Sequence, residues 1–221
     1  MDDAAAIAAG RTVVCSPTGM AVSTTVRFLS YNIFLRIRGV SNPDSNDDWK
    51  DARLDAFVRD VLPNFDVVCL QEAHAKPSLA TAGRCARLIE GGRACGLVHH
   101  HRGPDPSVWG SRTFLDGGNL ILSRYPFVET HAMVYANGCH ADALAAKGAL
   151  HALVAVDAAR GAYLHVVSTH LQATYTFRPS ALCGEVQRRQ LVELRRFMAT
   201  HCDGTSARGW RGPPRARVGA F

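Results

Sequence analysis

A glutamate and a histidine that each follow an apolar run are the residues of this chain best suited to chemistry. Glu72 ends the segment Asp66-Val-Val-Cys-Leu-Gln-Glu72, and His170 lies in Val166-Val-Ser-Thr-His-Leu-Gln-Ala173. Apolar runs of this length indicate strands buried on both faces. Polar residues at the ends of such strands lie at the rim of a sheet, where the sheet fixes them and substrate can reach them. A carboxylate and an imidazole placed in this way suggest a metal-assisted phosphoester site.

The metal and phosphate chemistry of such a site can be assigned to three side chains. Glu72 together with waters is a common way to hold Mg²⁺, with substrate phosphate supplying further oxygens. Asn32, at the end of Ser30-Tyr31-Asn32, can ligate a hard cation or orient a nearby carboxylate. His170 can donate to a non-bridging phosphate oxygen. An asparagine in a turn, a solvated glutamate and a structural histidine are the ordinary alternatives.

Two further residues are candidates for substrate binding. Asn119 follows Gly117-Gly118, where the backbone can approach a ligand closely. Lys147 precedes Gly148 and can meet a phosphate. An ordinary glycine turn and an exposed lysine before a strand explain these two residues equally well.

The elements that must position these residues follow from hydrophobic periodicity. Strands are predicted at residues 26–34, 66–71, 96–101, 117–126, 127–135, 148–157 and 162–170. Helices are predicted before Pro63, over residues 78–90 with Gly91-Gly92 as the terminator, and over residues 180–200. Strands interspersed with three helices predict an α/β layered fold.

One domain is expected, over residues 26–202. Residues 1–25 are expected to be a disordered lead-in, and residues 203–221, dense in Arg, Pro and Gly, a disordered tail. The net charge of +6 suits an anionic or phosphate-bearing partner. With no signal sequence and no stretch long enough to span a membrane, a cytoplasmic protein is predicted.

Cysteine and histidine spacing gives no sign of a structural metal site. The seven cysteines are scattered without C-x-x-C spacing, so neither a disulfide framework nor a zinc site is indicated. The run His99-His100-His101 cannot face one site on a strand, because neighbouring side chains alternate between faces.

Taken together, the motifs resemble the endonuclease/exonuclease/phosphatase superfamily, whose members share a DNase I-like fold. The resemblance covers about residues 26–200 and is nearest to the neutral sphingomyelinase branch. The motifs that carry it occur in the family's order: Ser30-Tyr31-Asn32, Leu70-Gln71-Glu72, Gly118-Asn119 through Ser123-Arg124-Tyr125-Pro126, Lys147-Gly148-Ala149-Leu150, Ser168-Thr169-His170 with Leu171-Gln172-Ala173, and Arg188-Arg189-Gln190-Leu191.

The resemblance implies a four-layer α/β sandwich and Mg²⁺-dependent hydrolysis with one or two divalent ions. Glu72 and Asn32 would bind the metal, and His170 would contact the scissile phosphate, with Asn32 assisting. A lipid-directed member would cleave sphingomyelin to ceramide and phosphocholine, in peripheral contact with a membrane. Nucleic acid is the less expected partner, and the oligomeric state stays open.

The sequence departs from the family pattern after the last predicted helix. The family's Gly-Asp-x-Asn and Ser-Asp-His motifs, which position the water and the general base, do not occur in the 221 residues. The fold is therefore expected to be incomplete at its C-terminal end, and activity to be impaired. A nuclease or phosphatase of the same superfamily and a non-catalytic remnant or binding protein are the alternatives.

Overall fold

Two β-sheets form the centre of the molecule. The computed structural model describes residues 8–14, 24–36, 49–75, 79–104, 113–174, 181–202 and 216–220. The first sheet has the strand order β1 (Ala8–Val14), β2 (Thr24–Asn32), β3 (Val67–Gln71), β5 (Asn119–Ser123), β4 (His99–Gly103). The second sheet has the order β6 (Phe127–Val134), β7 (Gly148–Asp157), β8 (Ala162–Thr169), β9 (Ala216–Ala220).

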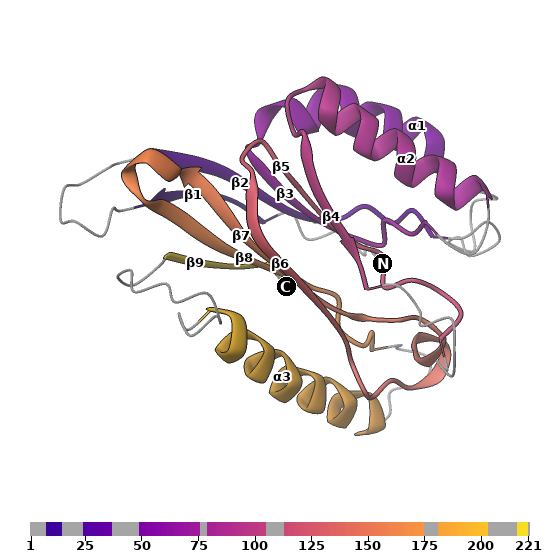
Figure 1. Ribbon diagram of the computed structural model, residues 1–221. Helices are drawn as coiled ribbons and strands as arrows, with labels where there is room; N and C mark the ends of the chain where they lie inside the picture. Colours follow the sequence, from indigo (N-terminus) through magenta and orange to yellow (C-terminus); the bar gives the residue numbers. More distant parts are fainter. Residues whose placement is uncertain are drawn as a thin grey trace.

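Helices cover the outer faces of both sheets and complete four layers (Figure 1). Helices α1 (Lys50–Ala56) and α2 (Leu79–Ala94) lie over the first sheet, and α3 (Ala181–Cys202) lies over the second. After Ala56 the chain continues through a π-helical turn, Phe57–Val61, and a 3-10 turn, Leu62–Asn64, which contains Pro63. The expected four-layer α/β sandwich is confirmed.

The main core lies between the two sheets. Alternate residues of β2, β3, β5, β7 and β8 point into it, among them Val67 and Ile121 from the first sheet and Val154 and Val166 from the second. Because side chains alternate along a strand, the remaining residues of β7 and β8 point outward, toward α3. The predicted hairpin is confirmed: β7 and β8 are antiparallel and are joined by a single turn, Ala158–Arg160.

The parallel pairing of β2 with β3 brings two strand ends to one edge. Asn32 and Gln71 are partners in this register, so Glu72 lies directly beyond the end of β3 and beside Asn32. The sheet therefore delivers these two side chains together, as the sequence predicted from strands that end in polar residues.

The end of α2 differs from the prediction. Gly91-Gly92 does not terminate the helix, which continues to Ala94 and is followed by Gly96, where φ is +93°. A Cβ on Gly91 would lie 2.4 Å from a Val58 methyl carbon, so this glycine allows α2 to pack closely on the neighbouring helical turn. Close packing, not termination, explains the glycine pair.

Two strands lie in segments for which the sequence predicted no elements. β1 pairs antiparallel with β2, and β9 pairs parallel with β8. Both strands pair with an open edge of a sheet. Because this pairing uses backbone groups, the local side-chain pattern gives little indication that these segments form strands. Among the described residues, no helix is long and apolar enough to cross a membrane.

Candidate active site

Glu72 is held in a constrained position at the end of β3. Its φ of +58° lies in the left-handed region, which costs energy for a residue with a side chain. Backbone hydrogen bonds from Ile33 to Gln71 and from Leu35 to Glu72, both 3.1 Å, fix the chain on either side of Asn32. Asn32 Nδ2 donates to Glu72 Oε1 at 2.9 Å, so the two predicted metal ligands are in contact.

Arg36 engages the same carboxylate. Its Nε lies 2.5 Å from Glu72 Oε2, and its Nη2 lies 2.9 Å from Oε1. Burial alone would raise the pKa of Glu72, but the hydrogen bonds and charge of Arg36, aided by His170 and Asn32, lower this pKa to about 2. The carboxylate is therefore ionised at neutral pH, and it attracts cations.

His170 lies on the other side of this carboxylate. Its Nε2 is 3.8 Å from Glu72 Oε1, and the side chain is mostly buried. Burial and the positive charge of Lys147 lower the pKa of His170 to about 3. The imidazole is therefore neutral at physiological pH, and it keeps one ring N–H available to donate.

Lys147 is fixed by a short ion pair. Its Nζ donates to Asp142 Oδ2 at 2.7 Å and to the Leu171 carbonyl at 2.9 Å. Burial lowers the pKa of Lys147, although the Asp142 charge opposes this shift. Asp142 Oδ2 also accepts from the Ala173 backbone N–H at 2.8 Å, so the pair ties the segment after His170 to the start of β7.

The carbonyl oxygen of Gly148 joins the two halves of the site. It accepts from Asn119 Nδ2 at 2.9 Å, from Thr169 Oγ1 at 3.0 Å and from the His170 backbone N–H at 3.3 Å. Asn119 is fully buried, and its Oδ1 has no hydrogen-bond partner within the described part of the chain. Asn119 thus links β5 of the first sheet to β7 of the second.

Gly118 lets the chain pass close behind Glu72. Its φ is +66°, and a Cβ there would lie 3.0 Å from Glu72 Cα and 2.8 Å from His74 Cε1. Asp116 supports this segment, because its carboxylate accepts from the Gly118 N–H at 2.9 Å and lies 2.9 Å from His74 Nδ1. The Gly-Gly-Asn segment is therefore a tightly packed wall of the site.

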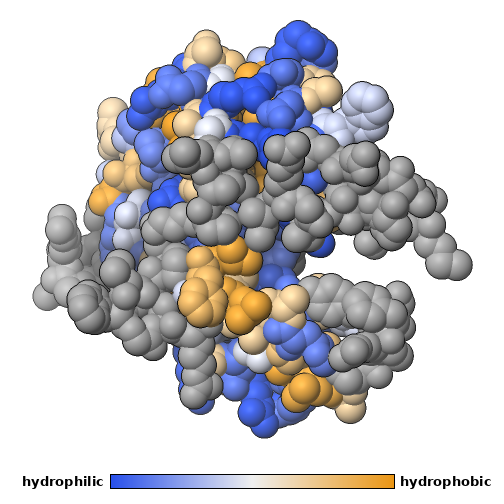
Figure 2. All heavy atoms as spheres, turned by 90° about the vertical axis from the view of Figure 1, so that its right-hand side faces the viewer, coloured by the Kyte–Doolittle hydropathy of each residue, from blue (hydrophilic) through white to orange (hydrophobic). Residues whose placement is uncertain are grey.

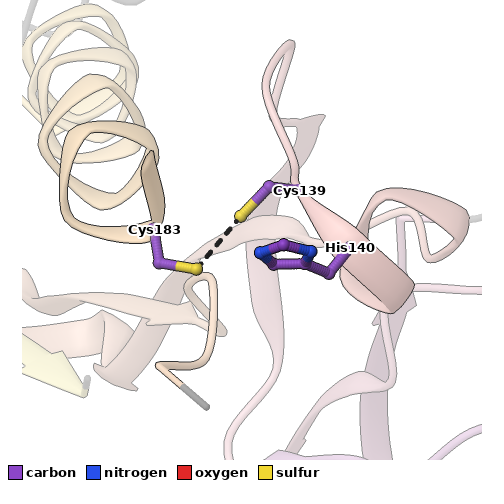
Figure 3. Close-up of side chains that lie close together, drawn as sticks. All are labelled: Cys139, His140 and Cys183. Carbon is purple, nitrogen blue, oxygen red and sulfur yellow. Dashed lines mark hydrogen bonds between the residues drawn. The ribbon is translucent and has the colours of Figure 1, made fainter. Parts of the chain in front are cut away.

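The loop after β8 is attached to the middle of α3. Gln172 N–H donates to Gln190 Oε1 at 2.8 Å, and Gln172 Oε1 accepts from the Cys139 N–H at 2.9 Å. Figure 3 shows the Cys139 and Cys183 thiols pointing at each other beside the His140 ring, with sulfurs 3.3 Å apart. Cysteine spacing gave no indication of this contact.

Exposed apolar side chains lie near the same loops. Phe114 is 72% exposed and Leu144 48% exposed, and the Phe114 N–H donates to the Leu144 carbonyl at 2.8 Å. Leu144 ends the 3-10 turn His140–Leu144, which also carries Asp142. Figure 2 shows hydrophobic side chains gathered in the middle of the face that is on the right in Figure 1, among hydrophilic ones.

The structure thus groups all the predicted site residues at one end of the sandwich. Glu72 touches Asn32 and lies near His170, while Asn119 and Lys147 anchor the strand ends behind them. Sequence reasoning missed several contributors to this arrangement, namely Arg36, His74, Asp116, Asp142 and Thr169. For Asp116, its place directly before Gly117-Gly118 is a local signal. No comparable signal marks Arg36.

The four-layer α/β sandwich, with polar side chains gathered at one end of its two sheets, is a DNase I-like fold. The profile described as the endonuclease/exonuclease/phosphatase family matches residues 29–211. The chain belongs to this family, as its sequence motifs indicated.

Several relatives of known name are similar to the chain. A sphingomyelinase of Dictyostelium discoideum is 30% identical over 122 residues, which are 53% of this chain and 26% of that protein. Sphingomyelinase C of Bacillus cereus is 33% identical over 90 residues, which are 41% of this chain and 26% of that protein. The chain therefore spans about a quarter of the length of these relatives.

Solved structures show the same architecture. SmcL has a TM-score of 0.64 and 25% identity, over 78% of this chain and 57% of its own. A beta toxin mutant of Staphylococcus aureus with bound magnesium ions has a TM-score of 0.65 and 22% identity, over 79% of this chain and 59% of its own. At the latter identity the likeness concerns the fold.

Proposed function

We propose that this chain is a divalent-metal-dependent phosphodiesterase directed at a sphingomyelin-like phospholipid. One observation carries the proposal: an ionised Glu72 contacts Asn32 and lies 3.8 Å from the neutral imidazole of His170. A cation-binding carboxylate beside a neutral N–H donor is the pairing that binding and polarising a phosphodiester require.

The donor set suits Mg²⁺. This ion prefers oxygen ligands and is commonly bound through one or two carboxylates, with waters and substrate phosphates completing its shell. Glu72 provides an ionised carboxylate, and the Asn32 amide lies next to it. The guanidinium of Arg36 already donates a hydrogen bond to Glu72, so the surroundings of this carboxylate accommodate a positive charge. A bound Mg²⁺ would polarise the phosphoryl group and stabilise the developing negative charge.

The remaining residues act on the phosphate and its position. His170 donates its ring N–H to a non-bridging oxygen and needs no deprotonation step, because its pKa is already about 3. Lys147, held by Asp142, adds positive charge next to His170. Asn119 keeps the start of β7, and with it Lys147, in register with the Glu72 side.

The surroundings favour a lipid substrate. Phe114 and Leu144 are exposed beside the turn that carries Asp142, where apolar side chains can rest against acyl chains or a membrane surface. The similarity to sphingomyelinases of Dictyostelium discoideum and Bacillus cereus supports the same substrate class. Sphingomyelin cleavage would release phosphocholine and leave ceramide.

The test measures phosphocholine release from sphingomyelin vesicles with and without Mg²⁺, with Mg²⁺ affinity measured by calorimetry. We expect Mg²⁺-dependent release that Glu72→Gln abolishes and that Glu90→Gln, at an exposed helix position, leaves unchanged. Nicking of plasmid DNA without phosphocholine release would show that the protein is a nuclease. Mg²⁺ binding without any turnover would identify a binding protein.

A further inference from the structure

A second group of chemically active side chains lies between the second sheet and α3. His131 on β6 is the direct partner of His151 on β7, and His165 lies on the adjacent strand β8. His201 and Cys202 form the last turn of α3. The His131 and His201 rings are stacked with centroids 3.8 Å apart, and those of His151 and His165 with centroids 5.0 Å apart.

The register of β7 explains why these residues meet on the α3 side. Leu150 and Ala152, on either side of His151, point into the core between the sheets. Ala149, which shares the face of His151, belongs to the apolar cluster that contains Phe197 and Cys202 of α3. None of these histidines belongs to the Glu72 site.

Three of the side chains form a compact and buried donor set. His151 is 0%, His165 1% and Cys202 4% exposed, and one potential ligand atom from each lies within 4.8 Å of the others. Nε2 of His151 is 2.7 Å from Nδ1 of His165. Nδ1 of His151 is buried and has no hydrogen-bond partner among the described residues. The close nitrogen pair, with a buried thiol in the same cluster, is the feature that points to a bound ion.

The donor atoms of these three side chains determine which kind of ion they can bind. Two imidazole nitrogens and one thiolate suit borderline-soft ions such as Zn²⁺ and do not suit Mg²⁺ or Ca²⁺. With Zn–N and Zn–S bonds of about 2.0 and 2.3 Å, tetrahedral ligand atoms lie about 3.3–3.8 Å apart, so the three groups need only small shifts.

We propose that His151, His165 and Cys202 bind one thiophilic divalent metal ion of the Zn²⁺ type, which fastens the C-terminal end of α3 to the second sheet. Binding releases the proton of the Cys202 thiol. The ion binds Nε2 of His151 and Nδ1 of His165 in place of the hydrogen bond between them, so each histidine keeps one proton, on Nδ1 of His151 and on Nε2 of His165. Glu129, His131 and His201 form a half-buried second triad whose ligand atoms also lie within 4.8 Å of one another.

Cobalt(II) is the probe for this site, because a thiolate bound to Co²⁺ gives a near-ultraviolet charge-transfer band and a tetrahedral ion gives intense visible bands. The full chain, stripped of metal by a chelator, is titrated with Co²⁺ and then with Zn²⁺. We expect bands that saturate at one equivalent of Co²⁺ and disappear when Zn²⁺ displaces it. Cys202→Ser should lose the charge-transfer band, and His151→Gln should bind far more weakly.

Two control variants separate this site from others in the chain. Cys183→Ser removes the other thiol cluster, Cys139, His140 and Cys183, and should leave the bands intact. Glu72→Gln should also leave them intact, so the result is independent of the proposed phosphodiesterase site. Circular dichroism of each metal-free variant verifies folding, and Zn²⁺ should raise the Tm of the wild type but not of His151→Gln. Wild type without bands, or bands that survive Cys202→Ser, would overturn the proposal.

Discussion

The guanidinium of Arg36 covers both oxygens of the Glu72 carboxylate, with Nε 2.5 Å from Oε2 and Nη2 2.9 Å from Oε1. The same guanidinium lies over the Phe34 ring, with its central carbon 4.2 Å from the ring centroid. A metal ion that binds Glu72 must therefore share the carboxylate with an internal cation or displace it. Arg36 should therefore lower the affinity of the proposed site for metal.

Arg36→Gln should bind Mg²⁺ more tightly than the wild type. Hydrogen bonds to a charged group are worth about 1.5–3 kcal/mol, so removing the competing cation should tighten binding by about tenfold or more. Isothermal calorimetry at pH 7 measures the change. Arg59→Gln, which removes an exposed arginine paired with Asp60, is the control and should leave Mg²⁺ affinity unchanged. Equal affinities for Arg36→Gln and wild type would show that Arg36 does not compete.

Stability should fall as the pH drops below about 6.5. His170 and His151 have pKa values of about 3 in the folded protein against 6.5 for the ordinary group, so between these values the unfolded chain binds more protons. Each histidine then contributes stability that is present above pH 6.5 and is lost at about 1.4 kcal/mol per pH unit below it. Urea unfolding between pH 5 and pH 7 measures this slope. His170→Gln should reduce by one the number of protons that the chain takes up when it unfolds.

Gly118→Ala should destabilise the fold and disturb the Glu72 site together. An alanine at φ +66° costs about 1–2 kcal/mol in backbone energy. Its Cβ would also press on Glu72 Cα and His74. Gly184→Ala is the matched control, since nothing lies within 4 Å of a Cβ at this position in α3. The Gly184→Ala change should leave the free energy of unfolding unchanged or raise it by up to about 1 kcal/mol. Free energies of unfolding in urea give both values.

Asp142→Asn should be strongly destabilising for a single change. It leaves the buried Lys147 ammonium without its charged partner, and breaking a buried ion pair from one side costs about 3–5 kcal/mol. Asp157→Asn, which weakens an exposed pair with Arg160, should cost less than about 1 kcal/mol. Similar losses for the two variants in thermal or urea unfolding would contradict the importance of the Lys147–Asp142 pair.

Oxidation should link Cys139 to Cys183. Their sulfurs are 3.3 Å apart and the residues are 44 positions apart, so closing this loop should stabilise the fold by about 4 kcal/mol from chain entropy. Burial and the Cys183 thiol raise the pKa of Cys139 to about 11, so the reaction should be slow at pH 7 and accelerate as pH rises. Mass spectrometry after oxidation detects the loss of two hydrogens. Cys183→Ser should prevent it.

The sequence predicted those parts of the site that depend on strand pattern alone. Glu72 and His170 follow apolar runs, and parallel pairing of β2 with β3 places Asn32 beside Glu72. The β7–β8 hairpin was also predictable, because alternation and turn residues encode it locally, whereas the four layers were expected from the family resemblance. The roles of Glu72, Asn32, His170, Asn119 and Lys147 stay predictions until they are measured.

Other features depend on contacts between distant segments. Arg36 reaches Glu72 only because the chain reverses at Phe34, where φ is +55°. The strands β1 and β9 depend on sheet edges that only the folded chain presents. The histidine cluster can be recognised only when the register of three strands and the face of α3 are known together. Apart from the neighbours His201 and Cys202, its members are far apart in the sequence.

The three hydrogen bonds that converge on the Gly148 carbonyl come from both sheets. Residue 148 must remain glycine, because a Cβ would lie 1.8 Å from the Met133 carbonyl oxygen. The packing between the sheets and the spacing of His170 from Glu72 therefore depend on the same junction, and a larger residue at position 148 should disturb both.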